Sequence, residues 1–369
     1  MASVGAHAVR RSAPRMITNP EIRIRQSTMR ASMRLITSDL PGTGGLHKTV
    51  PEDFEVEEIP AYEPSGDGPH TYLWIQKRGL TTEEAVNKLC SALGTPRRDA
   101  GVAGQKDRQG VTRQWLSLPE VDPERALAVD IPSLKVLRAV RHRNKLRTGH
   151  LHGNKFRLVI RGCVAGALGH AQAIMDRLTQ GGFPNYYGPQ RFGAHGDNAA
   201  RGKALLTTTG KRASGSQLRL LLSAYQSELF NRYLDGRIDD GLFGDILVGD
   251  VLQKVESGGL FAVADEAERV LALPRFAAGE VVPTGPMFGP KMKPPTPDSP
   301  AALREDQLLA AEGVPASAWQ GGLTEGTRRA LLVRPTEATV AAGDTDEVVL
   351  GFGLPSGSYA TCILHEVMK

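Results

Sequence analysis

The chain has 369 residues, of which 40% are hydrophobic and 23% are charged, and its formal net charge is +5. These proportions are ordinary for a soluble globular protein, and no apolar run approaches the length of a membrane-spanning helix, so we expect no membrane partner. A chain of this length divides into two domains more often than it forms one large core.

The cysteines are scattered, and none of them forms a CxxC pair. This spacing argues against a zinc site and against a disulfide framework. Free thiols are typical of a reducing compartment, so we expect the protein to be cytoplasmic. The cysteines are Cys90, Cys163 and Cys362.

The first 40 residues carry the whole net charge, with seven arginines against Glu21 and Asp39. The rest of the chain is formally neutral, so the global charge is a poor argument for nucleic-acid binding. Three interpretations of this Arg- and Ser-rich segment are open: an organellar transit peptide, a disordered extension, and an upstream start codon with the true start at Met16, Met29 or Met33. We favour a disordered extension over 1–40, because no amphipathic period is evident.

Alternation of apolar and polar residues predicts the first strands. Phe54 and Val56 alternate with acids, as is typical of an edge strand, and residues 70–76 form a second alternating run. A helix is predicted from Thr81, because Thr81 and Glu84 have the spacing of a capping box. A glycine at position 94 can end this helix.

The next loop places one carboxylate, Asp107, between Lys106 and Arg108, just before a predicted strand over 111–118. Flanking positive charge favours the ionised form of a carboxylate, so we expect Asp107 to be a permanent anion. Reactive groups are commonly carried on loops that rigid elements hold in place. Taken alone, the tripeptide is also typical of a solvated turn.

No acidic residue interrupts the basic stretch from Arg138 to Arg161. An unbroken run of positive charge repels itself and benefits from a polyanion, so we predict contacts with RNA phosphates. A solvated protein face is the alternative. The basic residues are Arg138, Arg141, Arg143, Lys145, Arg147, Lys155, Arg157 and Arg161.

The second half of the chain contains further predicted elements. Helices are expected over 164–180 and 214–234, from their stripes of apolar residues. Gly and Pro accumulate over 236–330, which indicates a separate inserted lobe. A strand over 346–352 and a half-buried strand over 359–367 are predicted to close the chain.

Residues 185–193 read NYYGPQRFG and combine adjacent aromatics, glycines and polar side chains. A pocket for a planar base needs such residues, since aromatics stack on bases at about 1–3 kcal/mol each and amides contact base edges. A turn whose aromatics only fill the core is the alternative. A buried Tyr187 hydroxyl without a partner would cost about 1–3 kcal/mol.

Three segments together resemble the signature of the TruD family of tRNA pseudouridine synthases. They are GQKDRQGVTRQW at 104–115, the segment 185–193, and LPSGSYAT at 354–361. Lys48, ahead of Pro-Glu-Asp-Phe, also matches a family lysine near the catalytic aspartate. One departure is Tyr187, where bacterial members usually have Phe.

The resemblance implies an α/β (α+β) fold with a catalytic domain of pseudouridine synthase type. It implies a mixed, largely antiparallel sheet built from 41–207 and 333–369, and an inserted second α/β domain over 208–332. The implied activity is isomerisation of uridine to pseudouridine in tRNA, at uridine 13 of tRNA-Glu especially. The implied reaction needs neither cofactor nor metal, and no obligatory protein partner is evident.

The resemblance also implies roles for individual residues. Asp107 would be the catalytic group, supported by Lys48 and Lys106, and it would either attack C1′ of the ribose or take a proton from C2′. Uracil contacts are implied for Asn185, Tyr187 and Tyr359. Expected RNA contacts are Arg141, Arg143, Lys145, Arg147, Lys155 and Arg191.

Two other functions compete with this one. A catalytically silent RNA chaperone would use the basic stretch together with Tyr186 and Tyr187. A hydrolase would pair Asp107 with a histidine such as His195 for acid–base chemistry.

Overall fold

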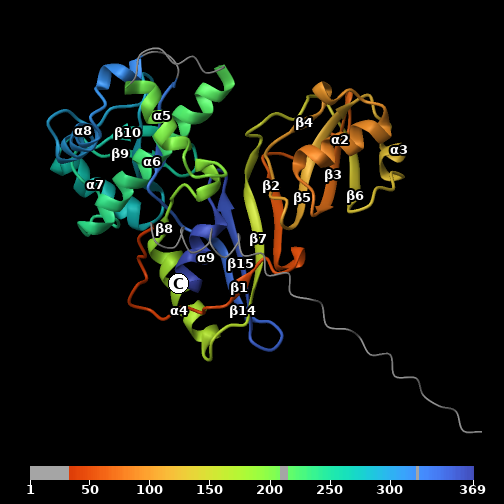
Figure 1. Ribbon diagram of the computed structural model, residues 1–369, viewed down its shortest axis with the longest axis horizontal. Coiled ribbons are helices and arrows are strands. Elements are labelled where there is room, and N and C mark those ends of the chain that lie inside the picture. The colour runs from red at the N-terminus through yellow and green to blue at the C-terminus, as the bar shows by residue number, and fades with distance from the viewer. Residues whose placement is uncertain (1–32, 208–214, 321–323) are drawn as a thin grey trace, which may run out of the picture.

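The computed structural model describes residues 33–207, 215–320 and 324–369. Within these residues a nine-stranded sheet and a four-stranded sheet are the main β structures (Figure 1). The strands of the larger sheet are β1 (Leu46–His47), β2 (Phe54–Pro60), β3 (His70–Arg78), β4 (Gly101–Val102), β5 (Val111–Pro119), β6 (Leu134–His142), β7 (Leu151–Arg161), β14 (Thr336–Ala342) and β15 (Glu347–Pro355).

The larger sheet runs in the order β14-β15-β7-β2-β5-β3-β6, with β1 beside β7 and β4 beside β5. Among the strands formed by the described residues only β2 and β5 of this sheet pair in parallel, so the prediction of a mixed, largely antiparallel sheet is confirmed. The prediction of an edge strand at Phe54 and Val56 is wrong, since β2 lies between β7 and β5. Its alternating acids are tolerated there because Glu55 pairs with Arg113 and Arg157 of the two neighbouring strands.

Helix α2 (Thr82–Leu93) covers one face of the β3/β5/β6 half of the sheet. The predicted capping box is present, because the Thr81 hydroxyl accepts from the Glu84 amide at 3.1 Å while the Glu84 carboxylate accepts from the Thr81 amide at 2.7 Å. Gly94, with a φ of 71°, ends the helix as predicted. A short helix, α3 (Pro123–Leu127), follows β5.

Helices α4 (Ala167–Gly181) and α9 (Ala360–Met368) pack against the β7/β15/β14 half of the sheet. The prediction of a strand over 359–367 is wrong, because this segment is α9. Every residue of α9 except Thr361 is buried. A helix that is buried on nearly all sides has no polar face, so periodicity does not separate it from a buried strand.

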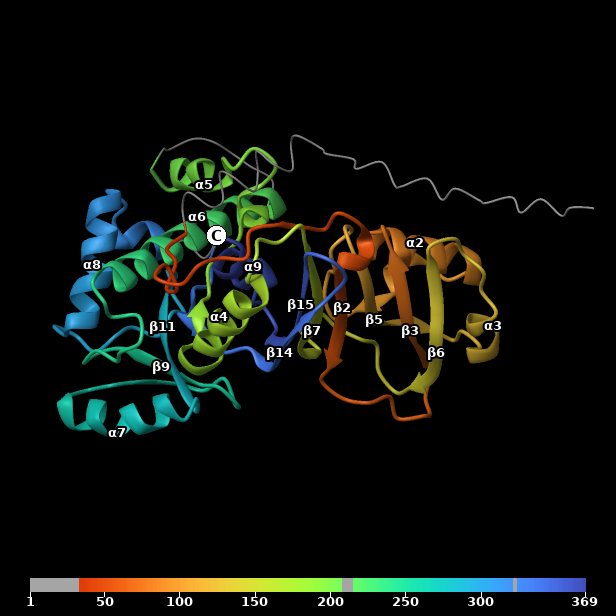
Figure 2. The same ribbon diagram turned by 90° about the horizontal axis from the view of Figure 1, so that it is seen from below.

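The four-stranded sheet has the order β10-β9-β11-β12 and lies wholly within residues 251–330, inside the range 208–332 expected for an inserted domain. In both views α4 and α9 lie between this sheet and β3 and β6 (Figures 1 and 2). The strands of the four-stranded sheet are β9 (Val251–Lys254), β10 (Leu260–Ala262), β11 (Val281–Met287) and β12 (Thr327–Ala330). The helices in this part of the chain are α5 (Asn198–Thr207), α6 (Gly215–Asp239), α7 (Glu266–Ala277) and α8 (Pro300–Glu312).

The part of the chain that forms the larger sheet and the part that forms the four-stranded sheet contribute to one hydrophobic core. Phe230 of α6 and Met287 of β11 belong to the same buried cluster as Leu350 of β15 and Ile363 of α9. A short pair, β8 (Phe183–Pro184) with β13 (Leu332–Val333), also joins the two sides. No helix in the described part of the chain is long and apolar enough to span a membrane.

Residues 33–40 fall inside the predicted disordered extension 1–40, but the structure packs them against the body of the protein. Met33 is buried, and the Glu366 carboxylate accepts hydrogen bonds from the amides of Ile36 and Thr37 at 3.0 and 3.2 Å. Residues 33–40 are therefore part of the packed structure. The rest of the predicted extension lies outside the described residues.

Candidate active site

A cavity of about 1350 Å³ brings the three sequence segments together. Its wall contains residues 103–109 of the loop before β5, residues 186–190 and 192–196, and residues 356–361 ahead of and within α9. Asp107, Lys48, Tyr187 and Tyr359 all line it, although they are far apart in the sequence. The predicted carboxylate and the predicted aromatic residues therefore face one space.

Lys48 is the charged partner of Asp107. Its Nζ donates to Asp107 Oδ2 at 2.5 Å and lies 3.9 Å from the centroid of the Phe54 ring. Burial alone raises the pKa of Asp107, but the Lys48 charge and hydrogen bond, together with the backbone amides of Gln109 and Arg108, outweigh it, so this pKa lies below the ordinary value. Lys48 has a φ of 59°, an uncommon conformation for a residue other than glycine and one that is enriched at functional sites.

The residues beside Asp107 in the sequence do not supply this charge. Lys106 Nζ pairs with the buried Glu58 carboxylate at 2.8 Å, and Arg108 pairs with Glu84 at 3.0 Å. Asp107 is therefore ionised as expected, but the positive charge that favours this form comes from Lys48 and not from Lys106 or Arg108. Lys106 was predicted to support Asp107, but its charge is neutralised by Glu58 instead.

The backbone of the Asp107 loop is held from several sides. The buried Lys77 of β3 donates to the carbonyl oxygens of Leu80 at 2.6 Å, Asp107 at 2.9 Å and Lys106 at 3.4 Å. The Lys106 amide donates to the Thr82 hydroxyl at 2.8 Å. Sequence reasoning missed Lys77, although a lysine at an inward-facing position of an alternating strand was a usable signal.

Tyr187 and Tyr359 form an aromatic wall of the cavity, with ring centroids 6.3 Å apart and ring planes at 60°. Asn231 of α6 fixes Tyr187, because its amide accepts from the Tyr187 N–H at 2.9 Å and donates to the Tyr187 carbonyl at 3.0 Å. Tyr187 is only partly buried, so its hydroxyl can remain hydrated. The helix predicted over 214–234, which is α6 in the structure, thus also positions a predicted site residue.

Asn185 is placed differently from the prediction. Its side chain donates to the Ala330 carbonyl at 2.9 Å and accepts from Arg329 at 2.7 Å, and the residue is 4% exposed. It does not line the cavity. In this arrangement Asn185 supports the segment that carries Tyr187, and a direct contact with uracil would require its amide to turn.

The basic stretch is paired with acids that its own sequence lacks. These acids come from other segments, so the expected self-repulsion is largely offset within the protein. Among the described residues Arg141 and Arg147 make no ion pair, and Lys145 donates to the Arg98 carbonyl at 2.8 Å. The ion pairs are Arg138–Glu63, Arg143–Asp67, Lys155–Glu337, Arg157–Glu55, and Arg161 with Asp53 and Glu347.

Two further residues of the prediction lie near the aromatic wall. Arg191 donates to the Ser227 hydroxyl at 2.9 Å, and its guanidinium is 5.5 Å from the centroid of the Tyr187 ring. His195 is exposed on the cavity wall and makes no hydrogen bond to Asp107 in the described part of the chain. An acid–base pair would place these two groups about 2.6–3.2 Å apart.

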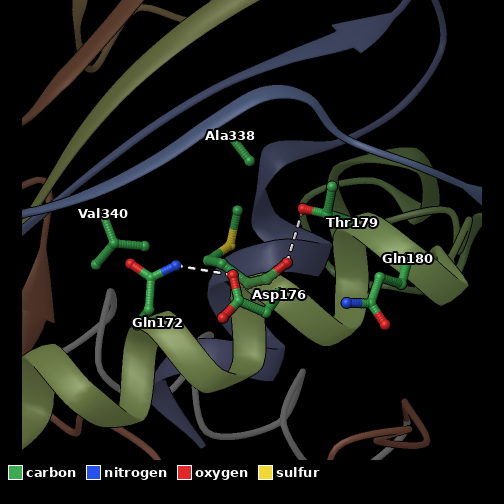
Figure 3. A pocket seen from close by; sticks show the side chains of 7 residues that line it. Gln172, Asp176, Thr179, Gln180, Ala338 and Val340 are labelled. Atoms are coloured by element: carbon green, nitrogen blue, oxygen red, sulfur yellow. Dashed lines mark hydrogen bonds between the residues drawn. The ribbon is translucent and has the colours of Figure 1, made fainter.

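A second, smaller cavity of about 170 Å³ lies between α4 and β14 (Figure 3). Its charged side chain, Asp176, accepts from Gln172 at 2.8 Å one helical turn away, and the Thr179 hydroxyl donates to the Met175 carbonyl at 2.7 Å. These are ordinary contacts along one helix. We assign no site to this cavity.

Comparison with known sequences finds the same family that the three sequence segments resemble. The sequence model of the family described as tRNA pseudouridine synthase D (TruD) matches residues 30–218 and 211–367. The tRNA pseudouridine synthase D of Anaeromyxobacter sp. (strain Fw109-5) is 49% identical over 345 residues, which cover 91% of this chain and 95% of that protein. The protein of the same name from Thermus thermophilus is 42% identical over 337 residues, which cover 90% and 91% of the two chains.

A solved structure shares the fold. The crystal structure of the TruD protein from Methanosarcina mazei superposes with a TM-score of 0.73 and covers 94% of this chain and 98% of that one. The two sequences are 22% identical in this superposition.

Replacing Lys77 with Met should change how stability depends on pH. Burial lowers the pKa of Lys77 to about 8, although the charge of Asp107 opposes the shift. An unfolded lysine titrates near 10.4, so between about pH 8 and pH 10.4 the unfolded wild type binds one proton more than the folded form. The free energy of unfolding of the wild type should therefore rise relative to Lys77→Met by up to about 3 kcal/mol over this range.

Urea unfolding of both proteins at several pH values measures this difference. Lys88→Met, at an exposed position of α2, is the matched control and should show no such trend. A pH-independent difference between wild type and Lys77→Met would contradict the depressed pKa of this lysine.

Proposed function

The chain belongs to the TruD family of tRNA pseudouridine synthases, and we propose that it converts uridine in tRNA into pseudouridine with Asp107 as the catalytic carboxylate. The observation that carries this proposal is the shared cavity. An aspartate held ionised by Lys48 and an aromatic pair, Tyr187 and Tyr359, line the same space. Its volume of about 1350 Å³ leaves room for a nucleotide.

The reaction breaks the N1–C1′ bond of a uridine, turns the uracil and joins C5 to C1′. The hydrogen on C5 is then lost as a proton, and N1 gains one. The ionised Asp107 either attacks C1′ or takes the C2′ proton, and both routes need its lone pair free at neutral pH. The aromatic wall would hold the detached uracil by stacking, so that it rotates instead of leaving.

The target within tRNA follows from the family resemblance. We propose uridine 13, with tRNA-Glu among the substrates. A base inside folded RNA must first leave its stack, which costs a few kcal/mol, and contacts along the RNA backbone would offset this cost. We also propose that 208–332 acts as a second domain beside the cavity, since Asn231, Arg232 and Asp235 of α6 line it.

Four of the six proposed phosphate contacts fall into two groups. Arg141 and Arg147 have no ion-pair partner among the described residues, so their charge is available to RNA. Arg143 and Lys155 pair with exposed acids, Asp67 and Glu337, at 3.0 and 2.7 Å. Exposed pairs of this kind contribute little to stability, so an RNA phosphate can replace the carboxylate at small cost.

Asp107→Asn should abolish the modification while leaving the RNA bound. The amide cannot act as nucleophile or base, so pseudouridine formation in tRNA should fall by at least about 10²–10⁴-fold. Mapping pseudouridine along purified tRNA-Glu, after incubation with each protein, measures both the rate and the position. Asp130→Asn, an exposed aspartate on the same lobe, is the matched control.

Equal modification by wild type and Asp107→Asn would refute the catalytic assignment. Refolding of tRNA without modification by either protein would favour the chaperone. Release of free base or cleaved RNA would favour the hydrolase.

Removing the charge of Arg141, Arg143 and Lys145 together by Ala substitution should weaken tRNA binding and flatten its salt dependence. Each lost phosphate contact lowers the slope of log affinity against log salt by about 1. Binding titrations at several salt concentrations measure this slope. A triple Ala variant of Lys254, Arg269 and Arg275 removes the same charge from β9 and α7, which lie outside the predicted basic stretch.

The control variant should keep the wild-type slope. If the two triple variants have the same slope as the wild type, the basic stretch is solvated surface.

A further inference from the structure

We propose that Arg329 is a positioning residue that sets the geometry of the aromatic wall and ties it to the four-stranded sheet. This inference rests on the proposed function, because it assigns the wall the task of holding the detached base. Arg329 lies on β12, where it pairs with Gly285 of β11. It was not among the residues predicted from the sequence.

Arg329 joins the two segments that carry the aromatic residues. Its Nε and Nη2 donate to the Asn185 carbonyl at 3.1 and 3.0 Å, and Nη2 also donates to the Asn185 side chain at 2.7 Å. Nη1 donates to the Gly357 carbonyl at 3.0 Å. Since Asn185 is two residues before Tyr187 and Gly357 two residues before Tyr359, one guanidinium fixes both segments.

The same guanidinium contacts the rings themselves. Its central carbon lies 4.0 Å from the centroid of the Tyr187 ring, 5.4 Å from that of Phe230 and 5.9 Å from that of Tyr359. At 4.0 Å a cation and a ring attract each other appreciably, above all where water is partly excluded. The positions of both tyrosine rings thus depend on one side chain that does not itself line the cavity.

Among the described residues the guanidinium of Arg329 contacts aromatic rings but no carboxylate. In the described part of the chain it forms no ion pair, whereas the adjacent Arg328 pairs with Glu305 at 2.7 Å on the other face of β12. Successive side chains of a strand point to opposite faces, so Arg328 packs between the four-stranded sheet and α8 while Arg329 points toward the aromatic wall. A structural arginine of this sheet would be expected to have an acidic partner, as Arg328 does.

The contacts require a planar fork. Nε and Nη2 of Arg329 donate to Asn185 and Nη1 donates to Gly357, while the guanidinium lies over the Tyr187 ring. The compact ammonium of lysine cannot reproduce this pattern. Arg329→Lys keeps the charge and the stem but loses the fork. Misplacement of a reacting group by about 1 Å can lower a rate by about 10²-fold.

Arg334 offers a matched control. Its Nε donates to the Gln180 carbonyl at 3.0 Å, its Nη2 donates to the Phe276 carbonyl at 3.2 Å, and it lies 5.1 Å from the Phe276 ring centroid. These are contacts of the same kind, made away from the cavity. Arg334→Lys therefore shows how the loss of a hydrogen-bonded guanidinium outside the cavity affects the stability of the protein.

The test compares Arg329→Lys, Arg334→Lys and wild type by single-turnover modification of tRNA at saturating enzyme. An inactive fraction of enzyme does not lower this rate constant, so a folding defect alone does not mimic the effect. Arg329→Lys should be about 10- to 100-fold slower with unchanged tRNA affinity, and Arg334→Lys should match the wild type. Equal rates for all three would overturn the inference.

Hydrogen exchange of the free proteins tests the same point without activity. Amides over 185–187 and 357–359 should lose protection in Arg329→Lys but not in Arg334→Lys. Unchanged protection at both segments would also overturn the positioning role. If the exchange result holds but the wild type forms no pseudouridine, the proposed function fails while the structural role of Arg329 stands.

Discussion

The ion pair between Lys48 and Asp107 is the interaction on which the chemistry of this site depends. The cavity proposed to hold a nucleotide also buries the carboxylate, and burial favours the protonated form. Lys48 reverses this preference from 2.5 Å, and the chain places it there at a left-handed backbone position beside the Phe54 ring. The cations adjacent in sequence, Lys106 and Arg108, have carboxylate partners of their own.

The two sides of the cavity are held by independent sets of contacts. On one side Lys77 and Thr82 fix the backbone that carries Asp107. On the other, Asn231 holds the backbone of Tyr187, and Arg329 joins it to the turn before Tyr359. A base detached between two fixed walls can turn in place, which is what isomerisation requires and hydrolysis does not.

Local signals in the sequence predicted local structure well. The spacing of Thr81, Glu84 and Gly94 is enough to place α2, because capping involves residues within one turn of the helix. Two errors have a common cause: the central position of β2 and the helical form of α9 depend on what surrounds them. Neither the partner strands of Phe54 nor the burial of α9 on nearly all sides is encoded within the segment itself.

In the site, too, sequence segments indicate which residues matter, whereas the contacts of these residues depend on the fold. The resemblance of three segments to a known family pointed to Asp107 and Tyr187, but the partner of each cation is a property of the folded chain. A titration of the Asp107 carboxyl by carbon NMR, in the wild type and in Lys48→Met, tests this account most directly. The pKa of Asp107 should lie below the ordinary aspartate value in the wild type and should be higher in Lys48→Met, where the backbone amides of Arg108 and Gln109 still oppose burial but the lysine charge does not. The same pKa in both proteins would contradict it.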